Sequence, residues 1–127
     1  MFGIKRSLAD KYFSDFIRER DDWTCQRCKK EFEKPNQGLH CSHFHSRRNK
    51  STRWDMENCV ALCMRCHMHM GENPTDHCAF FLKRLGQDKY DKLSFRTNLL
   101  QRIDEKTIVM GLKIELKRMK EARKVLK

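Results

Sequence analysis

The chain is 127 residues long, the length of one domain or of a compact core with a helical extension. Lys and Arg number 28 against 17 Asp and Glu, which gives a formal net charge of +11. The composition argues against a membrane protein, because no stretch approaches the roughly 20 apolar residues of a spanning helix, and residues 1–10 lack the apolar run of a secretory leader. We therefore expect a cytoplasmic protein whose positive charge favours a polyanionic partner.

A helix is predicted first, over residues 7–20. Ser7 and Asp10 have the spacing of a capping box, in which the two residues satisfy each other's hydrogen bonds at a helix start. Apolar residues recur at helical spacing on one face: Leu8, Tyr12, Phe13, Phe16 and Ile17. We expect this face to pack on the core.

The next segment holds the first of two C-x-x-C motifs and then a strand. The motif lies between Trp23 and Phe32 and is typical of a short hairpin knuckle. A strand is predicted over residues 39–45, where the pattern alternates. Alternation places two sets of residues on opposite faces, with Cys41, His43 and His45 on one and His40, Ser42 and Phe44 on the other.

Residues 46–54 form a strongly basic loop, and no acidic residue occurs between Pro35 and Trp54. Its cationic side chains are Arg47, Arg48, Lys50 and Arg53. Clustered cations of this kind position nucleic acid through its phosphates. We predict that these four residues bind the DNA backbone, whereas Trp54 is expected to be buried under the hairpin rather than stacked on a base.

All seven cysteines and all six histidines lie within residues 25–78. An odd number of cysteines cannot all form disulfides, and the cytosol keeps thiols reduced, so this concentration favours metal binding. The two C-x-x-C motifs contain Cys25, Cys28, Cys63 and Cys66. Two such motifs can present four thiolates to one structural Zn²⁺. Cys41, Cys59 and Cys78 lack partners at this spacing, and we expect them to pack as small apolar side chains.

After Asn73-Pro74 the sequence is helical in character. Residues 77–104 are predicted to form one or two helices broken at Gly86. Their core candidates include Phe81, Leu82, Leu93, Phe95 and Leu100. A last helix is expected from about residue 105 to residue 126, with an apolar stripe beside a lysine stripe. The apolar stripe suggests a homodimer.

Two histidines and an asparagine alternate with the cysteine pairs: His43, Asn58 and His67. This order resembles the zinc-bearing HNH endonucleases, the ββα-metal nucleases. It is most similar to the lambdoid phage NinG/Rap recombination endonucleases, which share a histidine-aromatic step (His43-Phe44 here) and an Arg-aromatic run that ends in asparagine (Arg53 to Asn58). A Leu-Gly-Gln at residues 85–87 is also similar, so the resemblance extends over about residues 16–93.

The resemblance implies an α+β fold with a small zinc-stabilised ββα-metal core at about residues 21–75. This core lies in a nuclease domain over residues 1–104, and a basic amphipathic helix over residues 105–127 follows. His43 would be the general base that takes a proton from the attacking water. Asn58 would orient the hairpin and fix the His43 ring through its backbone carbonyl, and His67 would bind a catalytic Mg²⁺ or Mn²⁺.

The second protein ligand of that cation is the point at which this sequence departs from the family pattern. Many HNH enzymes carry Asp or His immediately before the base, but Ser42 occupies that position here and is a poor ligand. His45 is a candidate replacement because it shares a strand face with His43. His40 and His69 are the alternatives.

Together these features predict a metal-dependent endonuclease that hydrolyses phosphodiester bonds of DNA in the cytoplasm of a bacterial or phage-infected cell. The resemblance suggests branched recombination intermediates as substrates, and nicking of ordinary duplex is the other option. The alternative is a non-catalytic zinc-ribbon protein that only binds nucleic acid. These two classes differ at His43, because a binding module needs no base beside a metal ligand.

Overall fold

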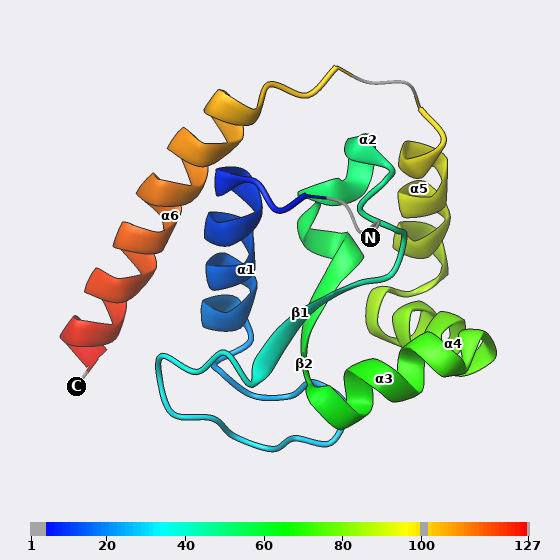
Figure 1. Ribbon diagram of the computed structural model, residues 1–127, viewed down its shortest axis with the longest axis horizontal. Coiled ribbons are helices and arrows are strands. Elements are labelled where there is room, and N and C mark those ends of the chain that lie inside the picture. Colours follow the sequence, from blue (N-terminus) through cyan, green and yellow to red (C-terminus); the bar gives the residue numbers. More distant parts are fainter. Residues whose placement is uncertain (1–4, 100–101, 127) are drawn as a thin grey trace.

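The computed structural model describes residues 5–99 and 102–126, and it places helices on both sides of a two-stranded antiparallel sheet (Figure 1). The strands are β1 (Leu39–His43) and β2 (Cys59–Cys63). The helices are α1 (Leu8–Arg20), α2 (Lys50–Arg53), α3 (Met64–Glu72), α4 (Pro74–Leu85), α5 (Gln87–Thr97) and α6 (Glu105–Leu126), with a 3₁₀ turn η1 (Met56–Asn58). The predicted mixed class and C-terminal helix are confirmed.

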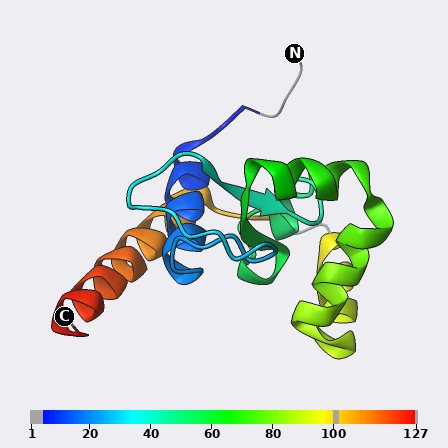
Figure 2. The same cartoon turned by 90° about the horizontal axis from the view of Figure 1, so that it is seen from below.

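Seen from below, α1 and α6 lie on one side of the sheet and α3 to α5 lie on the other (Figure 2). Helix α1 contacts both strands, and α3 also contacts both. The strand register pairs His43 with Cys59 and Leu39 with Cys63. The hairpin therefore carries the predicted strand histidines between α1 and α3.

Helix α1 begins where the capping box predicts. The Ser7 side chain accepts a hydrogen bond from the Asp10 backbone N–H, and the Asp10 carboxylate accepts one from the Ser7 backbone N–H at 2.8 Å. Phe13 and Ile17 of the predicted apolar face are buried, whereas Leu8 is 57% exposed. The helix and its buried face are confirmed, except at Leu8.

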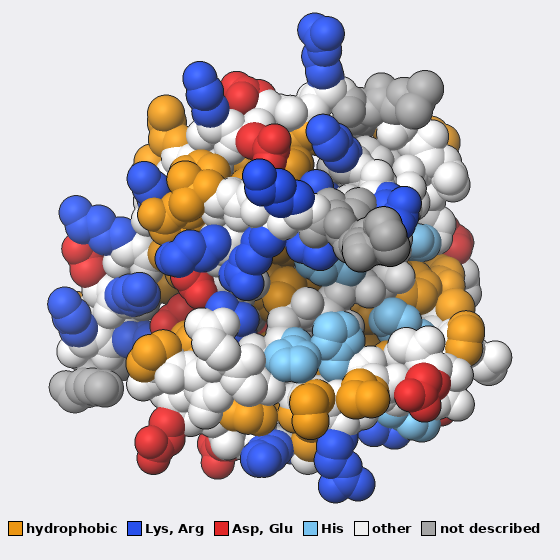
Figure 3. Space-filling model, viewed as in Figure 1, with side chains coloured by type: hydrophobic (Ala, Val, Ile, Leu, Met, Phe, Trp, Pro, Cys, Tyr) orange, Lys and Arg blue, Asp and Glu red, His pale blue; other side chains and the backbone are white. Residues whose placement is uncertain are grey.

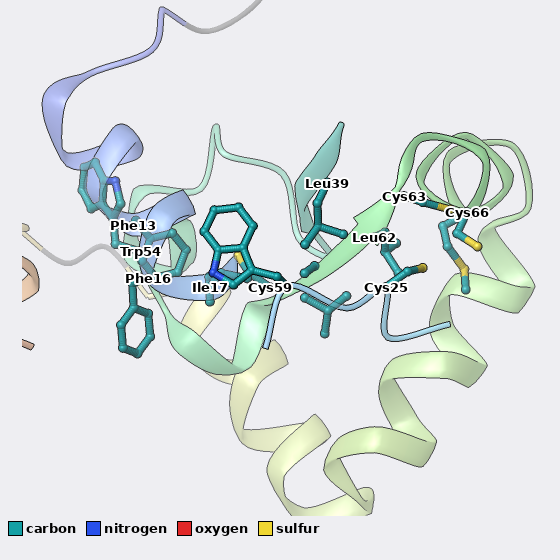
Figure 4. Close-up of a cluster of buried hydrophobic side chains, with 14 of the residues drawn as sticks. Phe13, Phe16, Ile17, Cys25, Leu39, Trp54, Cys59, Leu62, Cys63 and Cys66 are labelled. Carbon is teal, nitrogen blue, oxygen red and sulfur yellow. The ribbon is translucent and has the colours of Figure 1, made fainter. Parts of the chain in front are cut away.

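The hydrophobic core extends from α1 across the sheet to the cysteine pairs (Figure 4). Phe13 and Trp54 lie at one end of it, and Cys25 and Cys66 lie at the other. Trp54 is 9% exposed, which confirms its predicted burial. A small polar chain thus uses the metal-site cysteines as part of its core.

The predicted break at Gly86 is confirmed. Gly86 has a φ of 83°, a left-handed conformation that glycine adopts without steric cost, and it separates α4 from α5. Phe81 and Leu93 are fully buried, as predicted, but Phe95 is 67% exposed and Leu82 is 37% exposed. Leu100 lies outside the described residues. Phe95 and Leu82 were predicted from spacing alone, and α4 and α5 offer them no covering layer.

Helix α6 packs along α1 in the same chain. Leu116 is buried, and the partly buried Val109, Leu112 and Met119 pack against the core cluster. The apolar stripe on which we based a homodimer is therefore covered by α1. Within residues 5–99 and 102–126, none of the helices combines the length and apolar character that crossing a bilayer requires.

Candidate active site and metal centre

The two C-x-x-C motifs meet at the end of the sheet. One sulfur from each of four residues lies within 4.8 Å of the other three: Cys25, Cys28, Cys63 and Cys66. Cys63 ends β2, so the strand and the start of α3 bring the second motif to the first. Four sulfurs in this arrangement match the closed tetrahedral set of a structural zinc site. The predicted cysteine cluster is confirmed as one that could bind zinc.

Burial and hydrogen bonds to sulfur shift the pKa values of two cysteines in this cluster in opposite directions. Burial by itself raises the pKa of Cys25, but backbone N–H groups of Cys28, Cys63 and Arg27 lower it to about 7. Burial raises the pKa of Cys66 to about 12, although the Arg27 guanidinium donates to its sulfur at 3.4 Å. Because Cys66 favours the protonated thiol, a cation bound by all four sulfurs must displace its proton.

His43 is the last residue of β1, and one of its ring nitrogens has a fixed partner. Nε2 lies 2.9 Å from the backbone oxygen of Arg53. A carbonyl oxygen only accepts hydrogen bonds, so Nε2 carries the proton in the neutral ring and Nδ1 offers a lone pair. Burial and, to a smaller extent, the charge of Arg47 lower the pKa of His43 to about 4, although the contact with the Arg53 carbonyl opposes them. The ring is therefore a neutral imidazole with one defined proton acceptor.

Arg53 forms part of the fold rather than of a DNA-binding surface. Its guanidinium donates to both carboxylate oxygens of Asp10, through Nε at 3.0 Å and through NH2, and it also donates to the backbone oxygen of Lys5. Arg53 is only 6% exposed. A buried carboxylate already pairs with its charge, so we do not assign Arg53 to the proposed phosphate-binding residues.

The Asp10 carboxylate also accepts a hydrogen bond from the Trp54 indole at 3.0 Å. Burial raises the pKa of this carboxyl, but the bonds from Arg53, the Ser7 backbone and Trp54 outweigh burial and lower the pKa to about 2. Asp10 is thus a charged anchor that joins α1 to the end of the basic loop.

Asn58 is fully buried and ties the basic loop to the hairpin. Its amide oxygen accepts from the His45 backbone N–H at 2.8 Å, and its amide nitrogen donates to the backbone oxygens of His45 and Thr52. The Asn58 carbonyl accepts from the Phe44 N–H, and the His43 ring contacts the Arg53 carbonyl instead of the expected Asn58 carbonyl. Asn58 instead holds Thr52, the residue before Arg53, and the Arg53 carbonyl contacts the His43 ring.

His67 lies in the first turns of α3 and faces His40 of β1. The Nδ1 atoms of the two rings are 3.0 Å apart. Burial lowers the pKa of His67, and the charge of His40 lowers it further. Two imidazoles that face each other through Nδ1 can share one proton in an N–H···N hydrogen bond, or both can bind one cation, at the roughly 2.0–2.1 Å of a Zn–N bond if it is zinc.

Three of the candidate histidines line one cleft, which has a volume of about 430 Å³. Its lining includes His40, His43, Cys41, His67, Arg47 and Arg6. Figure 3 shows histidine side chains around a hollow on this face, with Lys and Arg side chains beside it. Arg6 lies outside the predicted basic loop, and only its approach to the cleft in space identifies it.

The other histidines lie away from this cleft. His45 packs against Phe44, with a ring separation of 4.6 Å, and its Nε2 atom is buried without a hydrogen-bond partner. His45 does not line the cleft with His43, because β1 ends at His43 and the alternation stops there. His69 pairs with Asp76 at 2.8 Å and thereby links α3 to α4. Of the three candidate second ligands, the structure brings only His40 to His67.

The domain therefore consists of a two-stranded hairpin and a following helix, which is a ββα arrangement. It carries a four-cysteine cluster that could bind zinc and a cleft lined by histidines. Residues 25–72 match the family model described as HNH endonuclease. No curated protein and no solved structure matches the chain in such comparisons. The chain therefore contains an HNH domain, and this domain supports a nuclease-type function with nucleic acid as the substrate.

Proposed function

We propose that this protein is a metal-dependent DNA endonuclease that uses His43 as general base and binds its divalent cation, Mg²⁺ or Mn²⁺, through His67 and His40. One observation carries this proposal. The histidine with a fixed lone pair and the facing histidine pair line the same cleft, in the domain that matches the HNH endonuclease model.

Each residue has a separate task in this reaction. His43 Nδ1 accepts the proton of the attacking water while the Nε2 proton stays bonded to the Arg53 carbonyl. Asn58 is a positioning residue that holds the loop behind that carbonyl. A cation bound at His40 and His67 supplies charge stabilisation at the scissile phosphate and the leaving oxygen.

The four-cysteine cluster is proposed to hold Zn²⁺ with a structural role. Its all-sulfur ligand set favours Zn²⁺ over the hard Mg²⁺ ion, and a closed set leaves no position for substrate. A reducing cytoplasm, in a bacterial or phage-infected cell, would keep the thiols available.

The substrate is proposed to be branched DNA of the kind formed in recombination. Similarity of the His43-Phe44 and Arg53 to Asn58 motifs to the NinG/Rap endonucleases supports this choice. Incubating the protein with linear duplex, single strand, flap and four-way junction, with and without Mg²⁺ or Mn²⁺, tests both activity and substrate. Cleavage of junctions above duplex supports the proposal, nicked duplex supports a nickase, and binding without cleavage supports the zinc-ribbon alternative.

His67→Ala is expected to remove cleavage and the binding of added Mn²⁺ while the chain keeps its zinc. Loss of a direct ligand should weaken Mn²⁺ binding by more than the roughly 10–100-fold typical of an outer-shell partner. His40→Ala should also weaken cleavage and Mn²⁺ binding.

Calorimetry with Mn²⁺ and elemental analysis for zinc measure the two metals separately. His69→Ala is the matched control on α3, because His69 contacts Asp76 and not the cleft. Unchanged Mn²⁺ binding in His67→Ala and in His40→Ala would refute the proposal that these two histidines bind the catalytic cation.

Binding to DNA is expected to depend strongly on salt. Arg48 and Lys50 are exposed, and Arg47 is half-buried beside the cleft, 3.8 Å from Asp10. Changing all three to Ala should reduce the slope of log K against log salt by about 3, since each phosphate contact contributes about 0.9.

A triple change of Lys83, Lys89 and Lys92, exposed on α4 and α5, removes the same charge elsewhere and is the control. The slope should fall more in the loop variant than in this control. Equal slopes in the two triple variants would show that net charge, not the loop, sets the salt dependence.

A further inference from the structure

A second cluster of side chains that could bind a metal ion lies at the opposite end of the strand pair from Cys63. The Sγ atoms of Cys41 and Cys59 and a ring nitrogen of His43 all lie within 4.8 Å of one another. None of these residues belongs to the C-x-x-C motifs, and sequence spacing gave Cys41 and Cys59 only an apolar role. Their juxtaposition is a property of the folded hairpin.

The strand register explains how the three residues meet. His43 and Cys59 are direct cross-strand partners, and Cys41 precedes His43 by two residues, so all three project from the same face of the hairpin. The sulfur atoms of Cys41 and Cys59 lie within 4.8 Å of each other. The side chains are therefore held by the sheet itself rather than by a flexible loop.

His43 already has the second contact that a metal-binding histidine needs. Such ligands typically donate their other ring N–H to a carboxylate or a backbone carbonyl, which fixes the tautomer. The Nε2 contact to the Arg53 oxygen at 2.9 Å provides this, and the Phe13 ring, whose centroid is 6.1 Å from that of His43, restricts the ring further. Nδ1 is the nitrogen whose lone pair remains for an ion.

The cluster has one open side and one closed side. Cys41 and His43 line the cleft, whereas Cys59 is only 1% exposed and lies on the inner side. Two thiolates and one imidazole select soft or borderline ions such as Zn²⁺ and Co²⁺ over Mg²⁺. Three protein ligands also leave a fourth position for water, unlike the closed four-cysteine set.

We propose that Cys41, His43 and Cys59 form a second, thiophilic metal site, and that an ion bound there stops DNA cleavage. Inhibition follows because the ion uses the same His43 Nδ1 lone pair that accepts the proton of water. The inhibitory part rests on the proposed function, whereas the binding part depends only on the three side chains. Mg²⁺ would support the nuclease and Zn²⁺ in excess of the structural ion would switch it off.

Binding is tested with Co²⁺ added, under reducing conditions, to the 127-residue chain after it has been loaded with one zinc. Thiolate-to-cobalt absorption reports sulfur ligands, which the His40–His67 pair cannot supply, and zinc content shows that the structural ion is not exchanged. Wild type should gain this absorption with one Co²⁺ per chain. Cys41→Ser and Cys59→Ala should weaken it by more than about 10–100-fold in affinity. Cys78→Ser, at an exposed cysteine outside the cluster, should behave as wild type.

Inhibition is tested on the same proteins as the ratio of Mg²⁺-dependent cleavage with and without added Zn²⁺, so that differences in basal rate cancel. Occupancy should reduce cleavage by roughly 10²–10⁴-fold, the contribution of a general base. Cys41→Ser should need a higher Zn²⁺ concentration for the same loss.

The two proposals fail in different ways. No thiolate absorption in wild type, or absorption of equal affinity in Cys41→Ser, overturns the second site even if the protein cleaves DNA. Absorption in wild type with no cleavage under any condition overturns the proposed function and leaves the metal site in place. Cleavage that Zn²⁺ inhibits equally in wild type and Cys41→Ser overturns the inhibitory role.

Discussion

Cys63→Ser is expected to give protein that is unfolded or insoluble and that contains no zinc. Cys63 is buried and stands at the junction of β2 and α3, where it also starts the helix. A structural zinc site supplies about 10–16 kcal/mol of apparent binding free energy, and the whole free energy of unfolding of a small domain is about 5–15 kcal/mol. Loss of one thiolate therefore removes as much free energy as the fold possesses.

Elemental analysis and circular dichroism of the purified protein measure this outcome. Wild type should contain about one zinc per chain, and a chelator should reproduce the effect of the substitution. Cys78→Ser is the control, because Cys78 is exposed and lies outside both cysteine clusters. A Cys63→Ser protein that melts like wild type would mean that the cluster does not stabilise the fold through a metal.

His43→Ala is expected to reduce cleavage by roughly 10²–10⁴-fold, the usual contribution of a general base. Zinc content and DNA affinity should stay near wild type, because proton transfer is needed only in the transition state. Burial lowers the pKa of His43 to about 4, so protonation of this ring should reduce cleavage only well below the ordinary histidine value of 6.5.

A second variant separates chemistry from structure at this position. His43→Gln keeps an N–H group that can donate to the Arg53 carbonyl, but its amide is a far weaker base than imidazole. It should therefore fold better than His43→Ala and cleave no faster. If both variants lost DNA binding in proportion to cleavage, His43 would have a binding role and the zinc-ribbon alternative would gain support.

Local patterns predicted the parts of the structure that depend on neighbours in sequence. The capping box at Ser7 and Asp10 fixed the start of α1, and Gly86 marked the break between two helices. The C-x-x-C spacing predicted the four-cysteine cluster because each pair is held by its own short turn. The residues that define the first two features, and the two members of each cysteine pair, lie within a few positions of one another.

Contacts between distant segments could not be predicted in this way. Arg53 and Asp10 are 43 residues apart, and the composition of the basic loop gave no sign that one of its four cations is buried. His40 and His67 are 27 residues apart, and their pairing depends on α3 crossing the strand face opposite His43. Alternation also predicted that His45 shares a strand face with His43. The strand ends at His43, however, and the His45 backbone is held by Asn58, 13 residues away, which alternation cannot show.

Arg53 makes structural contacts through both its backbone and its side chain, so the two ends of the basic loop differ in the sequence changes that they tolerate. Its carbonyl lies 2.9 Å from the His43 ring and its guanidinium donates to Asp10 of α1, so the orientation of the His43 ring depends on a helix as well as on the loop. At the other end of the loop, Arg47 also lies 3.8 Å from Asp10, whereas the side chains of Arg48 and Lys50 are exposed. Under the proposed function, Arg48 and Lys50 can therefore be substituted without disturbing His43, whereas an insertion between Thr52 and Trp54 would break the contact between the His43 ring and the Arg53 carbonyl.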